Sequence, residues 1–258
     1  MLNKSLIKSL NKTCNARIED FRVLGDVTDT KDGQLIYIDR GCDTLGVAHL
    51  DYVDFVPARL HKNRVYCPQL DDRLGAWVLL YLLPYLDVEC DILLTDSEEV
   101  GRSTAKYFEP AKEYNWMFEF DRRGTDVVMY EYDSPENREL LDDHEFEVGY
   151  GSFSDISYLG HLGITGFNFG VGYHHEHTRR CYANLIDTLT QANKFVGFWD
   201  ELSDVPIPAP DVLFDPSPAW SKWDKWPENE TLCRDCGYAI NIEDTYCNEC
   251  GVCIWEIN

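Results

Sequence analysis

The chain has 258 residues, enough for one sizeable core and a small appended unit, and its hydrophobic fraction of 44% is typical of a globular protein. Its formal net charge of −23 repels phosphate groups, which disfavours a nucleic-acid partner or an anionic membrane surface. No apolar run is long enough to cross a bilayer, and residues 1–14 lack the apolar block of a secretory signal. We therefore expect a soluble cytoplasmic protein with reduced thiols.

Strand-like and helix-like patterns alternate from about Gln34 to Leu202. An amphipathic helix is expected near the N-terminus, and the first two strand-like runs after it are expected to be neighbours in a sheet. Ser134 followed by proline predicts the start of a later helix. The predicted strands cover residues 34–39, 44–53, 90–95, 116–121, 126–132 and 164–172, and the later predicted helices cover 72–86, 134–143 and 179–202. This alternation predicts an α/β fold in which a mostly parallel, mixed sheet is sandwiched by helices.

The composition changes after residue 202. Residues 203–230 hold six of the eleven prolines, together with Trp220, Trp223 and Trp226. The prolines predict an extended linker, whereas the tryptophans predict that it packs on its own domain or on a partner. We therefore divide the chain into a main domain (1–202), a linker (203–230) and a small C-terminal unit (231–258).

Four cysteines in the C-terminal unit are spaced like the ligands of a structural zinc ion. Cys233 and Cys236 form one Cys-x-x-Cys pair, Cys247 and Cys250 form a second, and ten residues separate the two pairs. Two such turns aim four thiolates at one point, as in a tetrahedral zinc ribbon. A redox Cys-x-x-Cys pair is the alternative, but two matched pairs favour the metal. We expect one zinc ion to stabilise this ribbon, which together with the linker would contact a protein partner.

Five short acidic or histidine motifs stand out in the main domain, and most follow a strand-like run directly. Each alone is common on protein surfaces. The carboxyl ends of parallel strands meet at one edge of a sheet, where sites form in open α/β folds, so the joint occurrence in this order is informative. The motifs are Val47-Ala48-His49-Leu50-Asp51, Leu70-Asp71-Asp72-Arg73-Leu74-Gly75, Leu94-Thr95-Asp96-Ser97-Glu98-Glu99-Val100-Gly101, Phe118-Glu119-Phe120-Asp121-Arg122-Arg123-Gly124 and Gly172-Tyr173-His174-His175-Glu176-His177-Thr178.

These five motifs resemble those of the co-catalytic zinc aminopeptidase and carboxypeptidase-like metallopeptidase superfamily, over about residues 34–202. The resemblance implies two zinc ions in one site. It makes His49 a ligand of the first zinc, with Asp51 behind it as an orienting catalytic residue. It makes Asp71 the ligand shared by both ions, followed by a cis peptide bond to Asp72. It also makes Asp121 a ligand of the first zinc.

The resemblance also assigns the third and fifth motifs. Glu98 would be the general base and Glu99 a ligand of the second zinc. Of the three late histidines we choose His177 as the remaining ligand, because relatives often have a histidine followed by serine or threonine here. Several relatives carry a glutamate four residues later, where this chain has Cys181. In this chemistry Glu98 takes a proton from a water shared by two zinc ions as that water attacks a scissile carbonyl.

Three further residues are candidates for substrate contact. Only 32 residues separate Asp121 from Ser154, so no inserted lid domain fits there. The stretch ending in Ser154-Asp155 resembles a segment of the leucyl aminopeptidase branch, which makes Asp155 a candidate. Tyr173 lies within the last motif, and Arg122 follows a predicted metal ligand. Arg122 would bind a substrate carboxylate or phosphate, or else form a surface salt bridge.

Three functions are compatible with these motifs. The first is an aminopeptidase-like hydrolase acting on a small peptide or acyl-amide substrate. The second is a non-peptidase amidohydrolase or cyclase that uses the same metal site. The third is a catalytically retired binding or adaptor protein, which an intact Glu98 disfavours because such a protein has no need of a general base.

Overall fold

The computed structural model describes residues 2–210, 230–232 and 239–241. The chain divides into two compact units, Met1–Asp211 and Val212–Asn258. In the second unit β11 (Glu230–Leu232) and β12 (Ala239–Asn241) pair as an antiparallel hairpin. The four cysteines of the predicted zinc ribbon and the three tryptophans of the linker lie outside the described residues, so the ribbon stays a prediction.

The first unit is built on a mixed, ten-stranded sheet. The four central strands, in the order β6-β3-β7-β9, run parallel, and the flanking strands pair antiparallel. The strand order is β1 (Asp26–Thr30), β2 (Gly33–Ile38), β6 (Asp91–Thr95), β3 (Thr44–His49), β7 (Trp116–Arg123), β9 (Gly166–His174), β10 (Tyr182–Asn184), β5 (Arg64–Tyr66) and β4 (Arg59–His61), with β8 (Val127–Val128) also pairing with β9. The expectation of a mostly parallel sheet therefore holds only at its centre.

The helical elements are unequal in length. The α-helices are α1 (Lys4–Asn15), α2 (Leu70–Trp77), α3 (Leu83–Tyr85), α4 (Pro135–Asp143) and α5 (Leu185–Leu202), and η2 (Val78–Leu82) is a π-turn that joins α2 to α3. Short 3-10 turns form η1 (Ile18–Leu24), η3 (Thr104–Tyr107), η4 (Tyr130–Tyr132) and η5 (Asp155–Leu162). Among the described residues no helix is long and apolar enough to cross a membrane.

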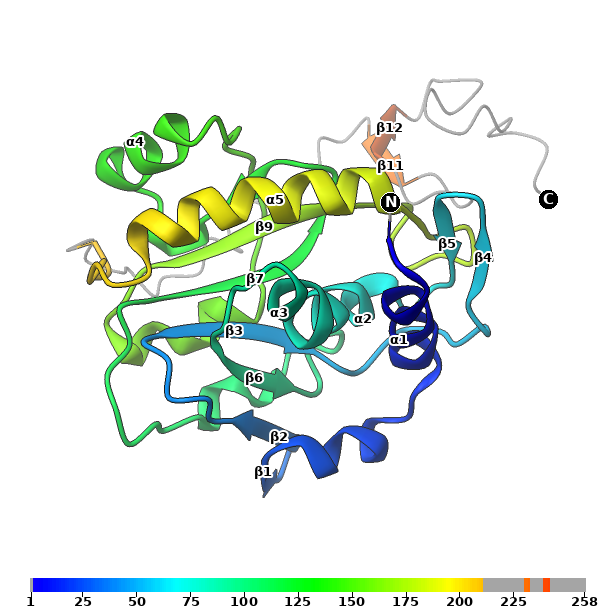
Figure 1. Cartoon of the computed structure of the whole chain (residues 1–258), viewed down its shortest axis with the longest axis horizontal. Helices are drawn as coiled ribbons and strands as arrows, with labels where there is room; N and C mark the ends of the chain where they lie inside the picture. Colours follow the sequence, from blue (N-terminus) through cyan, green and yellow to red (C-terminus); the bar gives the residue numbers. More distant parts are fainter. Residues whose placement is uncertain (1, 211–229, 233–238, 242–258) are drawn as a thin grey trace. The chain divides into compact units, whose positions relative to one another are not determined.

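One face of the sheet carries the large helices. Phe118 of β7 packs on Phe195 of α5, with ring centroids 4.6 Å apart. Gly46, which pairs with Phe118 across β3 and β7, lies against Leu79 of the α2–α3 segment. Neighbouring residues in register point to the same face, so α5 and the α2–α3 segment share it (Figure 1). The 3-10 turns η3 and η5 contact strands of the sheet, and Met117, which follows Trp116 on β7 and points the other way, faces η5.

Several predicted elements differ from the observed ones for identifiable reasons. The predicted neighbours at 34–39 and 44–53 are separated by β6, which pairs with both. The predicted helix at 179–202 begins only at Leu185, because Tyr182–Asn184 is used as strand β10. The predicted strand at 126–132 shortens to β8, since Tyr130 has a φ of +50°. The helix start at Ser134 is confirmed: its hydroxyl accepts the amide N–H of Asn137.

A buried carboxylate fixes the other end of the central strands. Asp91, at the start of β6, accepts hydrogen bonds from the hydroxyls of Tyr37 (2.6 Å) and Tyr114 (2.8 Å). It also forms an ion pair with Lys112 (2.6 Å). Two backbone amides of the 40–42 loop complete its shell. Burial raises the pKa of Asp91, but Lys112 and Tyr37 outweigh burial and hold the pKa at about 2.

We expect Asp91→Asn to lower the free energy of unfolding by about 2 kcal/mol at pH 7, because hydrogen bonds to an ionised group are lost. The pKa is lower in the folded than in the unfolded state, so the stabilisation is present above about pH 4 and fades as the pH falls toward 2. Urea unfolding of both proteins between pH 7 and pH 2.5 measures the difference between their free energies of unfolding. If this difference does not shrink below pH 4, the ionised Asp91 carboxylate is not the source of the stabilisation.

Candidate metal centre

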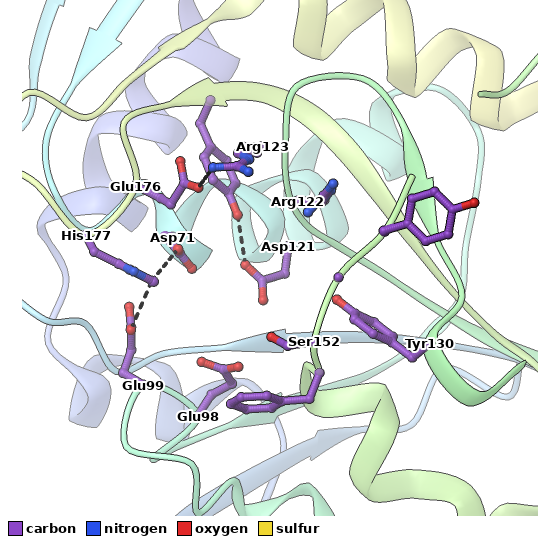
Figure 2. Close-up of a pocket in the computed structure, with 14 residues that line it drawn as sticks. Asp71, Glu98, Glu99, Asp121, Arg122, Arg123, Tyr130, Ser152, Glu176 and His177 are labelled. Atoms are coloured by element: carbon purple, nitrogen blue, oxygen red, sulfur yellow. Dashed lines mark hydrogen bonds and ion pairs between the residues drawn. The ribbon is translucent and has the colours of Figure 1, made fainter. Parts of the chain in front are cut away.

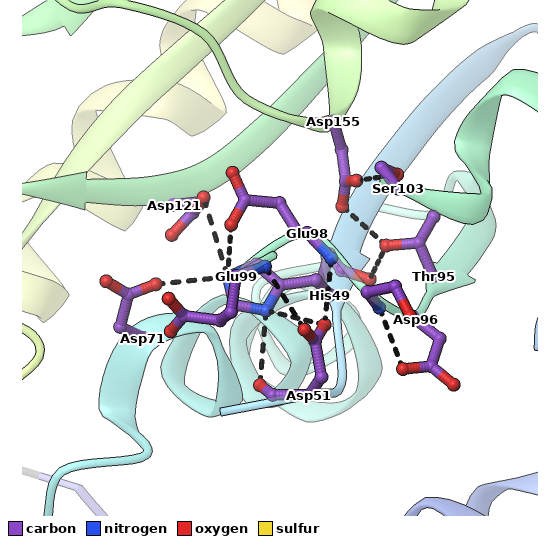
Figure 3. A network of polar contacts seen from close by, with 12 residues as sticks. His49, Asp51, Asp71, Thr95, Asp96, Glu98, Glu99, Ser103, Asp121 and Asp155 are labelled. Atoms are coloured by element: carbon purple, nitrogen blue, oxygen red, sulfur yellow. Dashed lines mark hydrogen bonds and ion pairs between the residues drawn. The ribbon is translucent and has the colours of Figure 1, made fainter. Parts of the chain in front are cut away.

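Residues of the first four motifs meet at the carboxyl edge of the four parallel strands (Figure 3). His177 of the fifth motif lies beside Asp71 and Glu99. All of these side chains except Asp71 are delivered by the end of a strand or by the turn after it, as expected for an open α/β sheet. The contributing residues are His49 at the end of β3, Glu98 and Glu99 after β6, Asp121 near the end of β7, His177 after β9, and Asp71 in the first turn of α2. The joint prediction that these motifs converge is therefore met by the geometry.

The first group of metal-binding atoms surrounds His49. Its Nε2 atom lies 3.0 Å from Oδ1 of Asp71 and 3.7 Å from Oδ2 of Asp121. These three side chains can each offer one ligand atom to a common ion. Tyr173 donates a hydrogen bond of 3.1 Å to the other oxygen of Asp121, which fixes the orientation of that carboxylate.

The second group uses the other oxygen of Asp71. Oδ2 of Asp71 lies 3.1 Å from Nε2 of His177, and the same nitrogen lies 3.3 Å from Oε2 of Glu99 (Figure 2). These three side chains form the second group with metal-ligand geometry. Among the late histidines, His174 and His175 instead pack against the ring of Tyr182. The two groups share Asp71, so its carboxylate is placed between them.

Asp51 links the histidine of the first group to the acidic loop. Nδ1 of His49 lies 3.2 Å from the main-chain oxygen of Asp51 and 3.4 Å from its carboxylate. That carboxylate accepts the backbone N–H groups of Glu98 and Glu99 at 3.2 and 3.1 Å. Burial raises the pKa of Asp51, but the hydrogen bond and charge of His49, together with the two backbone N–H groups, outweigh burial and lower the pKa. Asp51 therefore orients His49 and positions the loop in one arrangement.

The Asp-Asp-x-x-Gly motif has a local explanation. The peptide bond between Asp71 and Asp72 is cis, as the resemblance implies. Asp72 turns away from the ion groups, and its carboxylate accepts the backbone N–H of Gly75 at 3.0 Å. A Cβ atom on Gly75 would lie 2.3 Å from that carboxylate, so the turn requires glycine. Asp72 thus caps the helix while Asp71 faces the site.

The electrostatics of the site require cations. Burial, reinforced by nearby carboxylates, raises the pKa of Glu98 to about 8 and that of Glu99 to about 7. Burial also raises the pKa of Asp121 well above its usual range, and repulsion from Asp71 raises it further. Grouped carboxylates cannot all ionise without a compensating charge. Carboxylates combined with imidazole nitrogens are a donor set that suits zinc, so a pair of divalent cations fits these residues.

A cavity of about 390 Å³ opens above the two groups. Its wall includes the candidates Arg122 and Tyr173 as well as Glu98. Asp155, the third substrate candidate, does not line it. This side chain is 1% exposed and accepts hydrogen bonds from the hydroxyls of Thr95 and Ser103. Because these bonds join η5 to the end of β6, we assign Asp155 a supporting position beneath the site in place of substrate contact.

Several residues of the site were missed by sequence reasoning. Glu119 is fully buried beside Ser154, which donates a hydrogen bond to it. Strand alternation was the available signal, since Glu119 precedes Asp121 by two residues and so tends to share its face. Glu176, Tyr130 and the loop 150–153 also line the cavity. For the loop the available signal was the resemblance of residues 151–155 to a family segment, but its place in the cavity depends on tertiary packing.

Comparisons with known proteins support the fold. No family model matches the chain, and no curated protein matches it. Aminopeptidase PepT from Bacillus cereus matches with a TM-score of 0.56 at 12% identity, over 79% of this chain and 100% of that chain. A tripeptidase from Staphylococcus aureus gives 0.58 at 11% identity, over 79% and 99% of the two chains. An aminopeptidase from the archaeon Desulfurococcus kamchatkensis gives 0.53 at 13%, over 78% and 95%. The chain therefore has the fold of these aminopeptidases.

We expect metal binding at this site to strengthen as the pH rises from 6 to 9. The hydrogen bond to Asp71 raises the pKa of His177 to about 9, and burial raises that of Glu99 to about 7. A metal ion must displace these protons, so affinity should rise by about tenfold per pH unit for each proton released. Titration with Mn²⁺, followed by electron paramagnetic resonance, measures this without competition from the C-terminal thiols, which Mn²⁺ binds poorly.

His175→Ala is the matched control for His177→Ala in this titration, because His175 packs on Tyr182 and belongs to neither ligand group. The control should keep the pH dependence, whereas His177→Ala should weaken binding and flatten the curve. An affinity independent of pH in the unaltered protein would mean that these side chains are not the ligands.

Proposed function

We propose that the protein is a hydrolase with two zinc ions that cleaves an amide or peptide bond in a small peptide-like substrate, in the manner of an aminopeptidase. The observation that carries this proposal is the position of Asp71, whose two oxygens face the histidines of two separate ligand groups. The aminopeptidase fold of the first unit supports it independently.

The ligand roles follow from the two groups. His49, Asp71 and Asp121 would hold one ion, and Asp71, Glu99 and His177 the other. Two zinc ions held there would supply a water of lowered pKa and polarise the scissile carbonyl. The three ligand carboxylates do not cancel the four positive charges of such a pair, so the centre keeps a net attraction for a carbonyl oxygen.

Glu98 is the residue proposed to move the proton. It lines the cavity but belongs to neither ligand group, and its Oε2 atom lies 3.9 Å from Nε2 of His49. Cations beside it would lower its raised pKa again, because an opposite charge favours the ionised form. Glu98 would accept a proton from the attacking water and deliver it to the nitrogen of the leaving amine. The backbone N–H of Glu98 donates a hydrogen bond to Asp51, which keeps the Glu98 carboxylate at the edge of the ligand groups.

We expect Glu98→Gln to lower kcat at least about 100-fold, because general-base catalysis contributes roughly 10² to 10⁴ in rate. Zinc content should not change, since Glu98 is outside both ligand groups. A screen of peptide and acyl-amide substrates, combined with elemental analysis, measures both properties. Glu109→Gln, an exposed glutamate outside the cavity, is the matched control. Equal activity of Glu98→Gln and the unaltered protein would refute the role, and a binding function alone would survive the change.

A further inference from the structure

The metal cavity has a second side that the hydrolysis itself does not use. Asp71, Glu99 and His177 lie on one side of the cavity, Arg122 and Tyr130 lie on the other, and Asp121 lies between them (Figure 2). Arg122 and Tyr130 belong to neither metal ligand group. This wall would therefore meet a part of the substrate other than the bond that is cleaved.

An irregularity in β7 brings Arg122 to this wall. Between Glu119 and Arg122 the strand advances three residues while its partner β9 advances only from Asn168 to Gly170. Such a β-bulge interrupts the alternation of side chains and re-aims them. Consecutive residues of β7, Asp121 and Arg122, therefore line the same cavity, although regular alternation would send them to opposite faces.

The guanidinium of Arg122 is held by one edge only. Its Nε and Nη2 atoms donate to the two oxygens of Asp126 at 3.1 and 2.8 Å. Gly149 packs against this pair so closely that a Cβ atom there would lie 1.8 Å from the Asp126 carboxylate. Within residues 2–210, no hydrogen bond to Nη1 of Arg122 is formed. The arginine is thus fixed in place with donors to spare on its other edge.

The hydroxyl of Tyr130 provides a neighbouring donor. It accepts a hydrogen bond of 2.9 Å from the side-chain amide of Asn168, which also donates to the main-chain oxygen of Asp121 at 2.8 Å. A phenol that accepts still has its own hydrogen to donate. In the described part of the chain nothing accepts it, and the hydroxyl points into the cavity (Figure 2). Burial raises the pKa of Tyr130 well above its usual range, so it remains a donor.

We propose that the free edge of Arg122 and the hydroxyl of Tyr130 bind a carboxylate of the substrate, so that the preferred substrates are short peptides with a free C-terminal carboxylate. Two N–H groups and a hydroxyl match the two oxygens of a carboxylate. A phosphate dianion fits less well, because Asp126 already balances the charge of Arg122. The cavity volume of about 390 Å³ lies near the lower end of ligand pockets, which suits a short peptide.

This inference rests on the proposed function in one respect: the bond that is cleaved is taken to lie at the metal ligands. Binding and turnover are therefore tested separately. The binding test uses full-length, zinc-loaded Glu98→Gln, which should not consume its ligand. Calorimetry compares leucyl-alanine with leucyl-alaninamide, which differ only in the C-terminal group. We expect the free acid to bind about 10- to 100-fold more tightly, the range for hydrogen bonds to a charged group.

Variants in the same background locate the preference. Arg122→Met should reduce the ratio of the two dissociation constants to nearly one, and Tyr130→Phe, which removes only the hydroxyl, should reduce it about fivefold. Arg22→Met is the matched control, because Arg22 also contacts an aspartate, Asp29, through two nitrogens but lies outside the cavity. It should leave the ratio unchanged. Thermal unfolding and zinc content verify that each variant is folded and loaded.

The possible results separate the two proposals. If the unaltered protein hydrolyses both dipeptides without preferring the acid, or if Arg122→Met and Tyr130→Phe both keep the preference, the carboxylate site is wrong and the hydrolase stands. If Glu98→Gln binds the acid selectively through Arg122 but the unaltered protein cleaves neither compound, the carboxylate site stands and amide hydrolysis is wrong. If neither the acid nor the amide binds to Glu98→Gln, the carboxylate site is wrong.

Discussion

The whole site depends on one carboxylate that serves two histidines. The oxygens of Asp71 lie 3.0 Å from His49 and 3.1 Å from His177, residues that are separated by more than half of the main domain. Around this carboxylate several acids are packed at a spacing that they tolerate only with positive charge between them. The need for cations is therefore built into the positions of the side chains.

The parallel centre of the sheet makes this arrangement possible. Because β6, β3, β7 and β9 run in one direction, the residues that follow them emerge at one edge. Asp51 then couples two of these strand ends, since it contacts the ring of His49 and the backbone of the Glu98–Glu99 loop. At the opposite end Asp91 secures β6 against the loop 40–42 that leads into β3, so these two strands are anchored at both ends.

Sequence reasoning predicted the parts of the site that follow directly from local pattern. Most motifs stand at the end of an apolar run, so His49, Glu98 and Asp121 were expected at one edge. His177, the late histidine chosen from the sequence, lies beside Asp71 and Glu99, and its role as a ligand stays a prediction. Features that depend on pairing between distant segments were not predicted. The β-bulge that aims Arg122 into the cavity arises from the register of β7 against β9. The burial of Asp155 depends on hydrogen bonds to β6 and the turn after it, which lie far away in sequence.

The most direct test of the central claim is anomalous diffraction from crystals of the zinc-loaded full-length protein, recorded on both sides of the zinc absorption edge. Besides the peak expected from the zinc ribbon, the account predicts two anomalous peaks at this site, about 3.5–4 Å apart, one beside each oxygen of Asp71. The first should be in contact with His49 and Asp121, and the second with Glu99 and His177. A single peak at this site, or two peaks that do not flank Asp71, would contradict the two-metal site and the function proposed from it.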